Sequence, residues 1–315
     1  MPDSVPARTV PSMPPPGPAR PVVAEMRGIW ISDPRNLNWP RVMEELRGAG
    51  FNTLFVNFNT GGAAFHPSVV LPNIATRDEM RLCLDAARGA GIQVHAKFIV
   101  WYMFRSPPAY QKRLAREKRL LFAPNGGVLV QGEAPWLNPM HKINREERMA
   151  AIREALLNYA VDGVQLDYIR YPDNAGRITS GRIDLNTRFV ADVRAEMKRI
   201  RPHLPLSVSN FYDYGRARNE MGQDWVTWAH RGYVDFLCPM NYSRDPALVE
   251  KWLLDQQRLV KGRVPIYCGL GAYMLASPQQ LSSQITVARR AKAPGFVVFV
   301  YNEQFRQQIL PGIRF

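Results

Sequence analysis

Short apolar runs alternate with longer segments of helical period along the chain, from Met26 to the C-terminus. Apolar runs of about four to eight residues predict buried strands, and apolar residues every three or four positions predict amphipathic helices. We expect strands at 26–32, 52–58, 92–99, 163–169, 205–210, 234–240, 264–269 and 296–301, and helices at 40–49, 77–90, 144–161, 185–200, 223–231, 246–261 and 278–292.

Eight strands that alternate with seven helices predict an α/β protein with a (β/α)8 TIM barrel, as a single domain over 25–315. The doubly wound alternative is less favoured because no glycine-rich phosphate-binding motif follows any strand. About 44 residues separate the third strand from the next helix, against roughly 2–6 in an ordinary βα loop. We expect this long loop, Trp101 to Ile143, to be a substrate-binding excursion at the carboxyl face of the barrel.

The first 24 residues differ in composition from the rest, with eight of the 26 prolines and no aromatic residue. Such a segment cannot bury enough apolar surface to offset its ordering entropy, so we expect a Pro-rich flexible arm over 1–24. It lacks the basic and apolar regions of a signal peptide. We expect a periplasmic or extracellular location, with a cytoplasmic location as the alternative.

The fourth predicted strand, GVQLDYI, carries the strongest catalytic candidate. Val164, Leu166 and Tyr168 form one face, while Gln165 and Asp167 form the face that would line the barrel. Polar residues inside a barrel cost desolvation unless they are hydrogen-bonded or used in function. Asp167, nearest the carboxyl end, is therefore expected to be catalytic; alternatively, it pairs with Arg170 or another basic residue only to orient a loop.

Other strand ends supply amides, hydroxyls, aromatic rings and charges, which suit a sugar-binding cleft. A His and a Lys on the third strand could bind an anionic group or assist proton transfer. The expected substrate-binding residues are Asp33, Asn57, His95, Lys97, Trp101, Arg170, Tyr171, Asn210, Asp213, Asn241, Tyr242 and Tyr301.

The charge balance favours an anionic partner, since 41 Lys and Arg against 27 Asp and Glu give a formal charge of +14. The basic residues are scattered, and the densest cluster, 113–119, is interpreted as a solvated helix face. We find no nucleic-acid motif, and the longest apolar runs reach only about a third of the ~20 residues of a transmembrane helix. The three cysteines lack metal-ligand spacing, so neither a metal nor a cofactor is expected.

Five segments occur in the same order in the glycosyl-hydrolase-like family ten, formerly domain of unknown function 187, which the chain resembles over about residues 25 to 303. These are EMRGIWIS, VHAKF, PWLNP, NYAVDGVQLDYIRYP and VDFLCPMNY, of which DGVQLDYIRYP is the most specific. The resemblance implies a TIM barrel that acts on bacterial cell-wall or exopolysaccharide glycans; one branch resembles a hydrolase of peptidoglycan strands stripped of peptides. It matches Asp167 to the family's strand-four acid, and Arg170, Tyr171, Asn241 and Tyr242 to its rim motifs.

Two positions depart from related patterns. The fourth strand is similar to that of family-18 chitinases, but Ile169 stands where their catalytic Glu would be. Leu71 stands before Pro72, where relatives tend to carry an acid. Both departures favour the alternative of a catalytically silent glycan-binding protein on the same fold.

The main hypothesis is a glycoside hydrolase that acts on a bacterial polysaccharide through two carboxyl groups. Asp167 is one of them; its expected partner is Glu303 first, then Asp33, then Asp213. His95, Lys97 and Arg170 could bind an anionic substituent such as a lactyl carboxylate. A third hypothesis, a nucleic-acid binder, rests on net charge alone.

Overall fold

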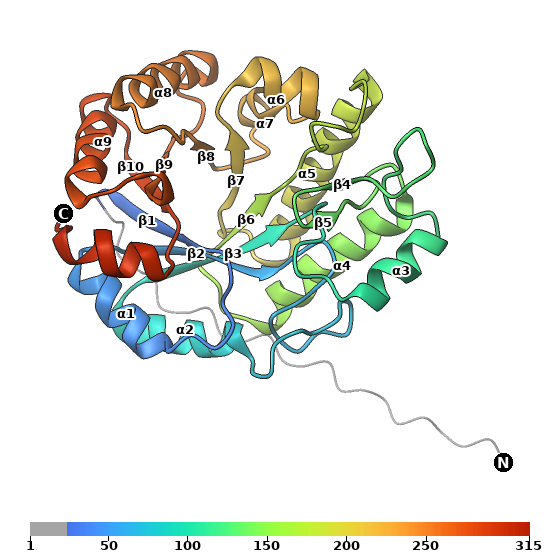
Figure 1. The fold of residues 1–315 in the computed structure, drawn as a ribbon, viewed down its shortest axis with the longest axis horizontal. Coiled ribbons are helices and arrows are strands. Elements are labelled where there is room, and N and C mark those ends of the chain that lie inside the picture. Colours follow the sequence, from blue (N-terminus) through green and yellow to red (C-terminus); the bar gives the residue numbers. More distant parts are fainter. Residues whose placement is uncertain (1–23) are drawn as a thin grey trace.

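Eight parallel strands close into a barrel in the computed structural model, which describes residues 24–315 (Figure 1). The hydrogen-bonded order is β1-β10-β9-β8-β7-β6-β3-β2, and β1 pairs with both β10 and β2 to complete the circle. The strands are β1 (Met26–Ile31), β2 (Thr53–Asn59), β3 (Gln93–Ile99), β6 (Gly163–Asp167), β7 (Leu206–Phe211), β8 (Phe236–Met240), β9 (Cys268–Gly271) and β10 (Gly295–Phe299). The predicted (β/α)8 barrel is confirmed, and each of these strands overlaps a predicted one.

Helices surround the barrel and follow most strands (Figure 1). Seven overlap the predictions: α1 (Trp39–Gly48), α2 (Glu79–Ala90), α4 (Lys142–Asn158), α5 (Ser180–Ile200), α7 (Trp225–His230), α8 (Pro246–Val260) and α9 (Pro278–Arg290). The sequence did not predict α3 (Pro108–Arg116), α6 (Tyr214–Met221), the short 3-10 turns Ala272–Met274 and Leu310–Gly312, or the π-helical turn Phe305–Ile309.

The barrel strands alternate between two packing environments, as their period of two requires. On β2, for example, Leu54 and Val56 belong to the large core between the strands and the helices, whereas Phe55 belongs to a smaller cluster inside the barrel. The same alternation turns Gln165 and Asp167 of β6 inward, as predicted. Apolar side chains thus fill the barrel interior at the amino ends of the strands, and polar groups are concentrated toward the carboxyl ends.

The segment between β3 and α4 is the long excursion that the sequence predicted. It contains α3 and a small antiparallel hairpin of β4 (Val130–Gln131) and β5 (Ala134–Pro135), drawn in green on the right of Figure 1. Isolated bridges of Tyr102 with Trp136 and of Leu120 with Leu137 fold the segment back on itself. The excursion is therefore an ordered substructure over this side of the barrel.

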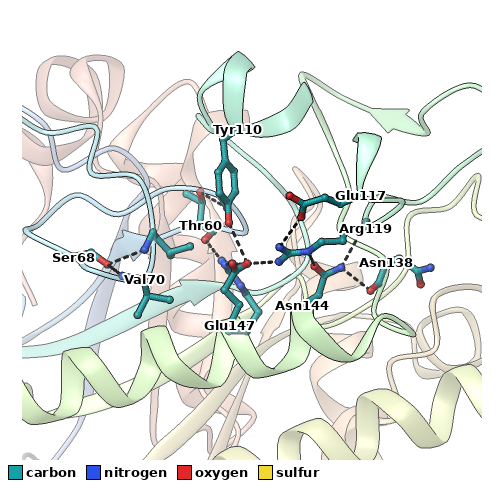
Figure 2. A network of polar contacts seen from close by, with 12 residues as sticks. Thr60, Ser68, Val70, Tyr110, Glu117, Arg119, Asn138, Asn144 and Glu147 are labelled. Atoms are coloured by element: carbon teal, nitrogen blue, oxygen red, sulfur yellow. Dashed lines mark hydrogen bonds and ion pairs between the residues drawn. The ribbon is translucent and has the colours of Figure 1, made fainter. Parts of the chain in front are cut away.

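A buried ionic network joins the excursion to α4 (Figure 2). The guanidinium of Arg119 donates one hydrogen bond to the carboxylate of Glu147 and another, of 2.9 Å, to Oδ1 of Asn144. Arg148 pairs with the same carboxylate at 3.2 Å, and Tyr110 donates its hydroxyl to it at 3.1 Å. The interpretation of 113–119 as a solvated face is therefore wrong at Arg119, which is 4% exposed. α3 ends before it, and the chain then turns inward to reach Glu147.

The predicted arm over 1–24 lies, apart from residue 24, outside the described residues. Over 24–315, no helix combines the length and the apolar character that crossing a membrane would need. The same part of the chain holds no cluster of three or more His, Cys, Asp or Glu side chains able to bind a metal ion.

Candidate active site

A cavity of about 900 Å³ opens at the carboxyl ends of the barrel strands. Residues at or just beyond the ends of β1, β2, β3, β6, β7, β8 and β10 line it, and the excursion closes part of its mouth. The lining side chains include Trp30, Ser32, Asp33, Arg41, Asn57, Lys97, Tyr102, Phe104, Arg105, Glu133, Asp167, Tyr168, Ser209, Tyr242, Phe299, Tyr301, Glu303 and Arg306. The position is where TIM-barrel proteins place their active sites.

Asp167, the last residue of β6, lies at the base of this cavity and is 5% exposed. Lys97 of the adjacent β3 places its ammonium Nζ 2.5 Å from Oδ2 of Asp167. The backbone N–H of Tyr168 donates to Oδ1 at 2.7 Å, with Tyr168 in the left-handed region at φ +51°. Both carboxylate oxygens are thus held, and Lys97 rather than Arg170 is the cation that pairs with Asp167.

Two buried polar atoms of the cavity floor have no protein partner among the described residues: Oδ1 of Asn57 and Oγ of Ser209. The amide Nδ2 of Asn57 donates to the carbonyl of Ser32 at 3.0 Å, which leaves Oδ1 as a free acceptor. Buried polar groups without a partner are costly. The two atoms are shielded from solvent beside the cavity, so their unpaired state is a cost that the fold carries at this place.

Aromatic rings form two walls of the cavity. On one side Tyr102 stacks on Tyr168, with ring centroids 4.9 Å apart, and on Phe104 at 6.3 Å. On the other side Tyr242 stacks on Phe299 at 5.4 Å. Burial raises the pKa of Tyr168 to about 12, so its phenol stays neutral at pH 7. Flat apolar faces beside hydrogen-bonding groups match a sugar ring, which presents both surfaces.

Three further carboxyl groups border the cavity. The pKa of Asp33 is lowered. Burial alone would raise this pKa, but the hydrogen bonds from Arg35 and the positive charges of Arg35 and Arg105 have the larger combined effect. Glu303 is largely exposed and accepts from Arg306 and Gln307 at 2.8 and 2.7 Å. The third, Glu133, lies in the turn of the excursion hairpin.

The structure places six of the predicted site residues, Asp33, Asn57, Lys97, Tyr242, Tyr301 and Glu303, on the cavity together with Asp167. The hydroxyl of Tyr301 donates to Glu45 at 2.8 Å, which ties this rim to α1.

His95 lies one layer below the cavity. Its ring packs against Phe55 and Phe236 with centroids 4.9 and 5.7 Å away, and a Cβ on Gly163 would lie only 2.2 Å from its Nδ1. Burial lowers the pKa of His95 to about 3, so the ring is neutral at pH 7. His95 therefore packs against the small apolar cluster inside the barrel and is not among the residues that line the cavity.

The other predicted residues are also absent from the cavity lining. Trp101 and Tyr171 are fully buried; Trp101 donates to Asn186 at 3.0 Å, and the guanidinium of Arg182 lies over Tyr171. Arg170 stacks on Trp136 and Tyr168, behind the aromatic wall. Asp213 caps α6, Asn241 exchanges hydrogen bonds with Gln256, and Asn210 donates to the carbonyl of Phe211.

Several residues that line the cavity were not predicted from the sequence. Ser209, Arg105, Glu133 and Phe299 line the cavity but are not among the residues expected from the sequence. Inward alternation on β7 and β10 could have identified Ser209 and Phe299. No periodicity marks Arg105 or Glu133, because both lie in the irregular excursion.

The closed barrel with a cavity at its carboxyl rim is also the fold of solved glycoside hydrolases. A solved relative in fold is the PgaB (BpsB) glycoside hydrolase domain from Bordetella bronchiseptica, with a TM-score of 0.66 at 14% identity over 87% of this chain and 94% of that one. An α-L-fucosidase isoenzyme 2 from Paenibacillus thiaminolyticus gives a TM-score of 0.64 at 12% identity, over 88% of this chain and 46% of that one.

The chain belongs to the family described as Glycosyl hydrolase-like 10, whose model matches residues 25–182 and 178–286. Among curated proteins, it is 22% identical to the glycosyl hydrolase DigH of Escherichia coli over 81% of this chain and 75% of the relative. The predicted family membership is confirmed.

Proposed function

We propose that this protein hydrolyses glycosidic bonds in a bacterial polysaccharide, with peptidoglycan-type glycan strands as the substrate, and that Asp167 acts directly on the bond that is cleaved. The observation that carries the proposal is the placement of Asp167: a buried carboxylate at the carboxyl rim, held by Lys97, between two aromatic walls of a cavity of about 900 Å³. The peptidoglycan substrate is supported by the resemblance to the family's branch that acts on peptide-free strands.

The geometry suits Asp167 to the role of nucleophile or base. Either role needs a carboxylate held in place beside the substrate, and the Lys97 ammonium holds Oδ2 of Asp167 at 2.5 Å. The Tyr168 N–H fixes the orientation of the carboxylate, so one oxygen edge faces the cavity consistently. Asn57 and Ser209 add polar side chains to the lining beside it.

The decisive experiment is the release of soluble sugar fragments from purified peptidoglycan, with and without its peptides, by the wild type and by Asp167→Asn. We expect fragments from the wild type alone, with the peptide-free strands as the better substrate. Wild-type protein that releases nothing from either material would overturn the proposed function.

A catalytically silent glycan-binding protein is the second candidate. Leu71 favours it: the side chain is buried against Ala64 and Ala151, where it offers no acid–base group. On this reading the wild type would be pulled down by the glycan without cleaving it, and Asp167→Asn would weaken the binding only.

A further inference from the structure

The four carboxyl groups on the cavity differ in their partners. Asp167 pairs with Lys97, Asp33 with Arg35 and Arg105, and Glu303 with Arg306. For the carboxylate of Glu133, residues 24–315 provide neither a hydrogen bond nor an ion pair. Glu133 is thus the acid of this cavity whose oxygens are free to meet a ligand.

The backbone places Glu133 at a defined point over the cavity. β4 and β5 are joined by the two-residue turn Gly132-Glu133, with Gln131 opposite Ala134. Gly132 has φ +70°, a conformation that suits the first central position of a tight hairpin turn. A Cβ there would lie 2.9 Å from the hydroxyl of Tyr102, so glycine also permits the close approach of this ring.

Tyr102 links the turn to the catalytic centre. Its hydroxyl accepts the backbone N–H of Glu133 at 3.0 Å, while its ring stacks on Tyr168 at 4.9 Å. Tyr168 in turn donates its N–H to Asp167. A continuous chain of contacts through two stacked rings therefore positions Glu133 relative to Asp167, and the excursion contributes an acid to the same cavity as the barrel.

We propose that Glu133 is the general acid that works with Asp167, an inference that rests on the proposed function above. Glu133 gives its proton to the glycosidic oxygen while the bond from that oxygen to the anomeric carbon breaks and its electron pair stays on the oxygen. Asp167 either attacks the anomeric carbon or takes a proton from the attacking water. If Asp167 attacks the anomeric carbon, Glu133 then regains its proton from the water that hydrolyses the glycosyl ester. If Asp167 instead deprotonates the attacking water, Glu133 regains a proton from solvent and Asp167 releases one to solvent.

The exposed position of Glu133 fits this role once a glycan is bound. A sugar chain lying against the aromatic wall of Tyr102, Phe104 and Tyr168 would cover the turn and bring its glycosidic oxygens beside the unpaired carboxyl group. Asp167, which is paired with Lys97, keeps the opposite role. Two carboxyl groups in different environments can thereby divide the two tasks.

The test compares Glu133→Gln with the control variant Glu146→Gln, which changes an exposed carboxyl group outside the cavity. With the glycan substrate, we expect Glu133→Gln to lower kcat by about 10²–10⁴-fold, the usual contribution of a general acid, and Glu146→Gln to leave kcat close to the wild-type value. Retained glycan binding and an unchanged Tm would show that Glu133→Gln is folded.

Two further readouts separate acid catalysis from a positioning role. The loss of wild-type activity at high pH, where a general acid becomes deprotonated, should be absent in Glu133→Gln. A dinitrophenyl glycoside of the released fragment has a leaving group that needs no proton, so Glu133→Gln should release dinitrophenol in the first turnover at a rate close to wild type. Equal behaviour of the two variants with an active wild type would overturn this inference alone, whereas an inactive wild type would overturn the proposed function.

Discussion

The ammonium of Lys97 and the carboxylate of Asp167 form an ion pair of 2.5 Å inside the barrel, where the two side chains are only 5% and 6% exposed. The Lys97 ammonium also lies 6.0 Å from the ring centre of Trp30. Each charge therefore depends on the other for compensation, because water reaches neither freely. The pair links the stability of the barrel to its chemistry.

Lys97→Met should leave Asp167 buried without its cation. Removing one partner of a buried pair typically costs about 3–5 kcal/mol, so we expect a loss of that order in the free energy of unfolding by urea. The double variant Lys97→Met with Asp167→Asn buries no charge and should recover part of the loss. Equal stabilities of the single and double variants would contradict the coupling.

Glu147→Gln should loosen the excursion, because the carboxylate of Glu147 compensates both Arg119 and Arg148. Glu147 is 17% exposed, so we expect roughly 2–3 kcal/mol of destabilisation, below the ~3–5 kcal/mol for breaking a fully buried pair. Its neighbour Glu146 is more than half exposed and, among residues 24–315, pairs with Lys142 alone, so Glu146→Gln should change the free energy of unfolding by no more than about 0.5 kcal/mol. Chemical denaturation with both variants measures the difference.

Acid should destabilise the protein partly through His95. Its pKa is about 3 in the folded state and about 6.5 in an unfolded chain, so the unfolded state binds more protons between these values. The stabilisation is complete above pH ~6.5 and is lost as the pH falls toward 3. We expect His95→Phe, which keeps a ring between Phe55 and Phe236, to reduce the pH slope of the unfolding free energy by up to ~1.4 kcal/mol per unit between about pH 6 and 4. An unchanged slope would show that His95 is charged or exposed.

Phe104→Ala should weaken glycan binding, because Phe104 extends the stacked wall of Tyr102 on the cavity. We expect KM to rise roughly tenfold, equivalent to about 1.4 kcal/mol of binding, with kcat nearly unchanged. Phe122→Ala is the matched control, since Phe122 is also half-buried in the excursion but does not line the cavity. A similar rise of KM in both variants would mean that the aromatic wall does not bind the sugar.

The barrel could be predicted from sequence because each strand is an apolar run between helices, a signal that depends only on local order. Alternation also placed Asp167 and Lys97 on the inner face correctly. Alternation could not predict which of Lys97 and His95, on the same face of β3, lines the cavity. The distance of each side chain from the cavity depends on the register of β3 with β2 and β6. Lys97 lines the cavity, whereas His95 is buried below it.

The remaining errors of the sequence-based predictions concern residues whose contacts are made with residues distant in the sequence. Arg119 looks solvated among its charged neighbours, and only the fold brings it to Glu147, 28 positions later. Trp101 follows β3 like a rim aromatic, yet its ring turns outward to Asn186 on α5. Glu133 lies in a turn without periodicity, and its place over the cavity depends on the side chain of Tyr102.

The excursion is attached to the rest of the protein at several places. Besides the ionic network on α4 and the stacked tyrosines at the mouth of the cavity, the Tyr102 carbonyl accepts the N–H of Gly61 at 3.0 Å, and Trp101 reaches Asn186. The N–H of Val100 donates to the carbonyl of Asp167 at 2.8 Å, so the start of the segment continues the hydrogen bonding between β3 and β6. Segment 100–141 is consequently part of the wall of the barrel, because its buried side chains belong to the same hydrophobic core as the helices. The shape of the cavity mouth and the stability of the fold therefore cannot be altered independently in this segment.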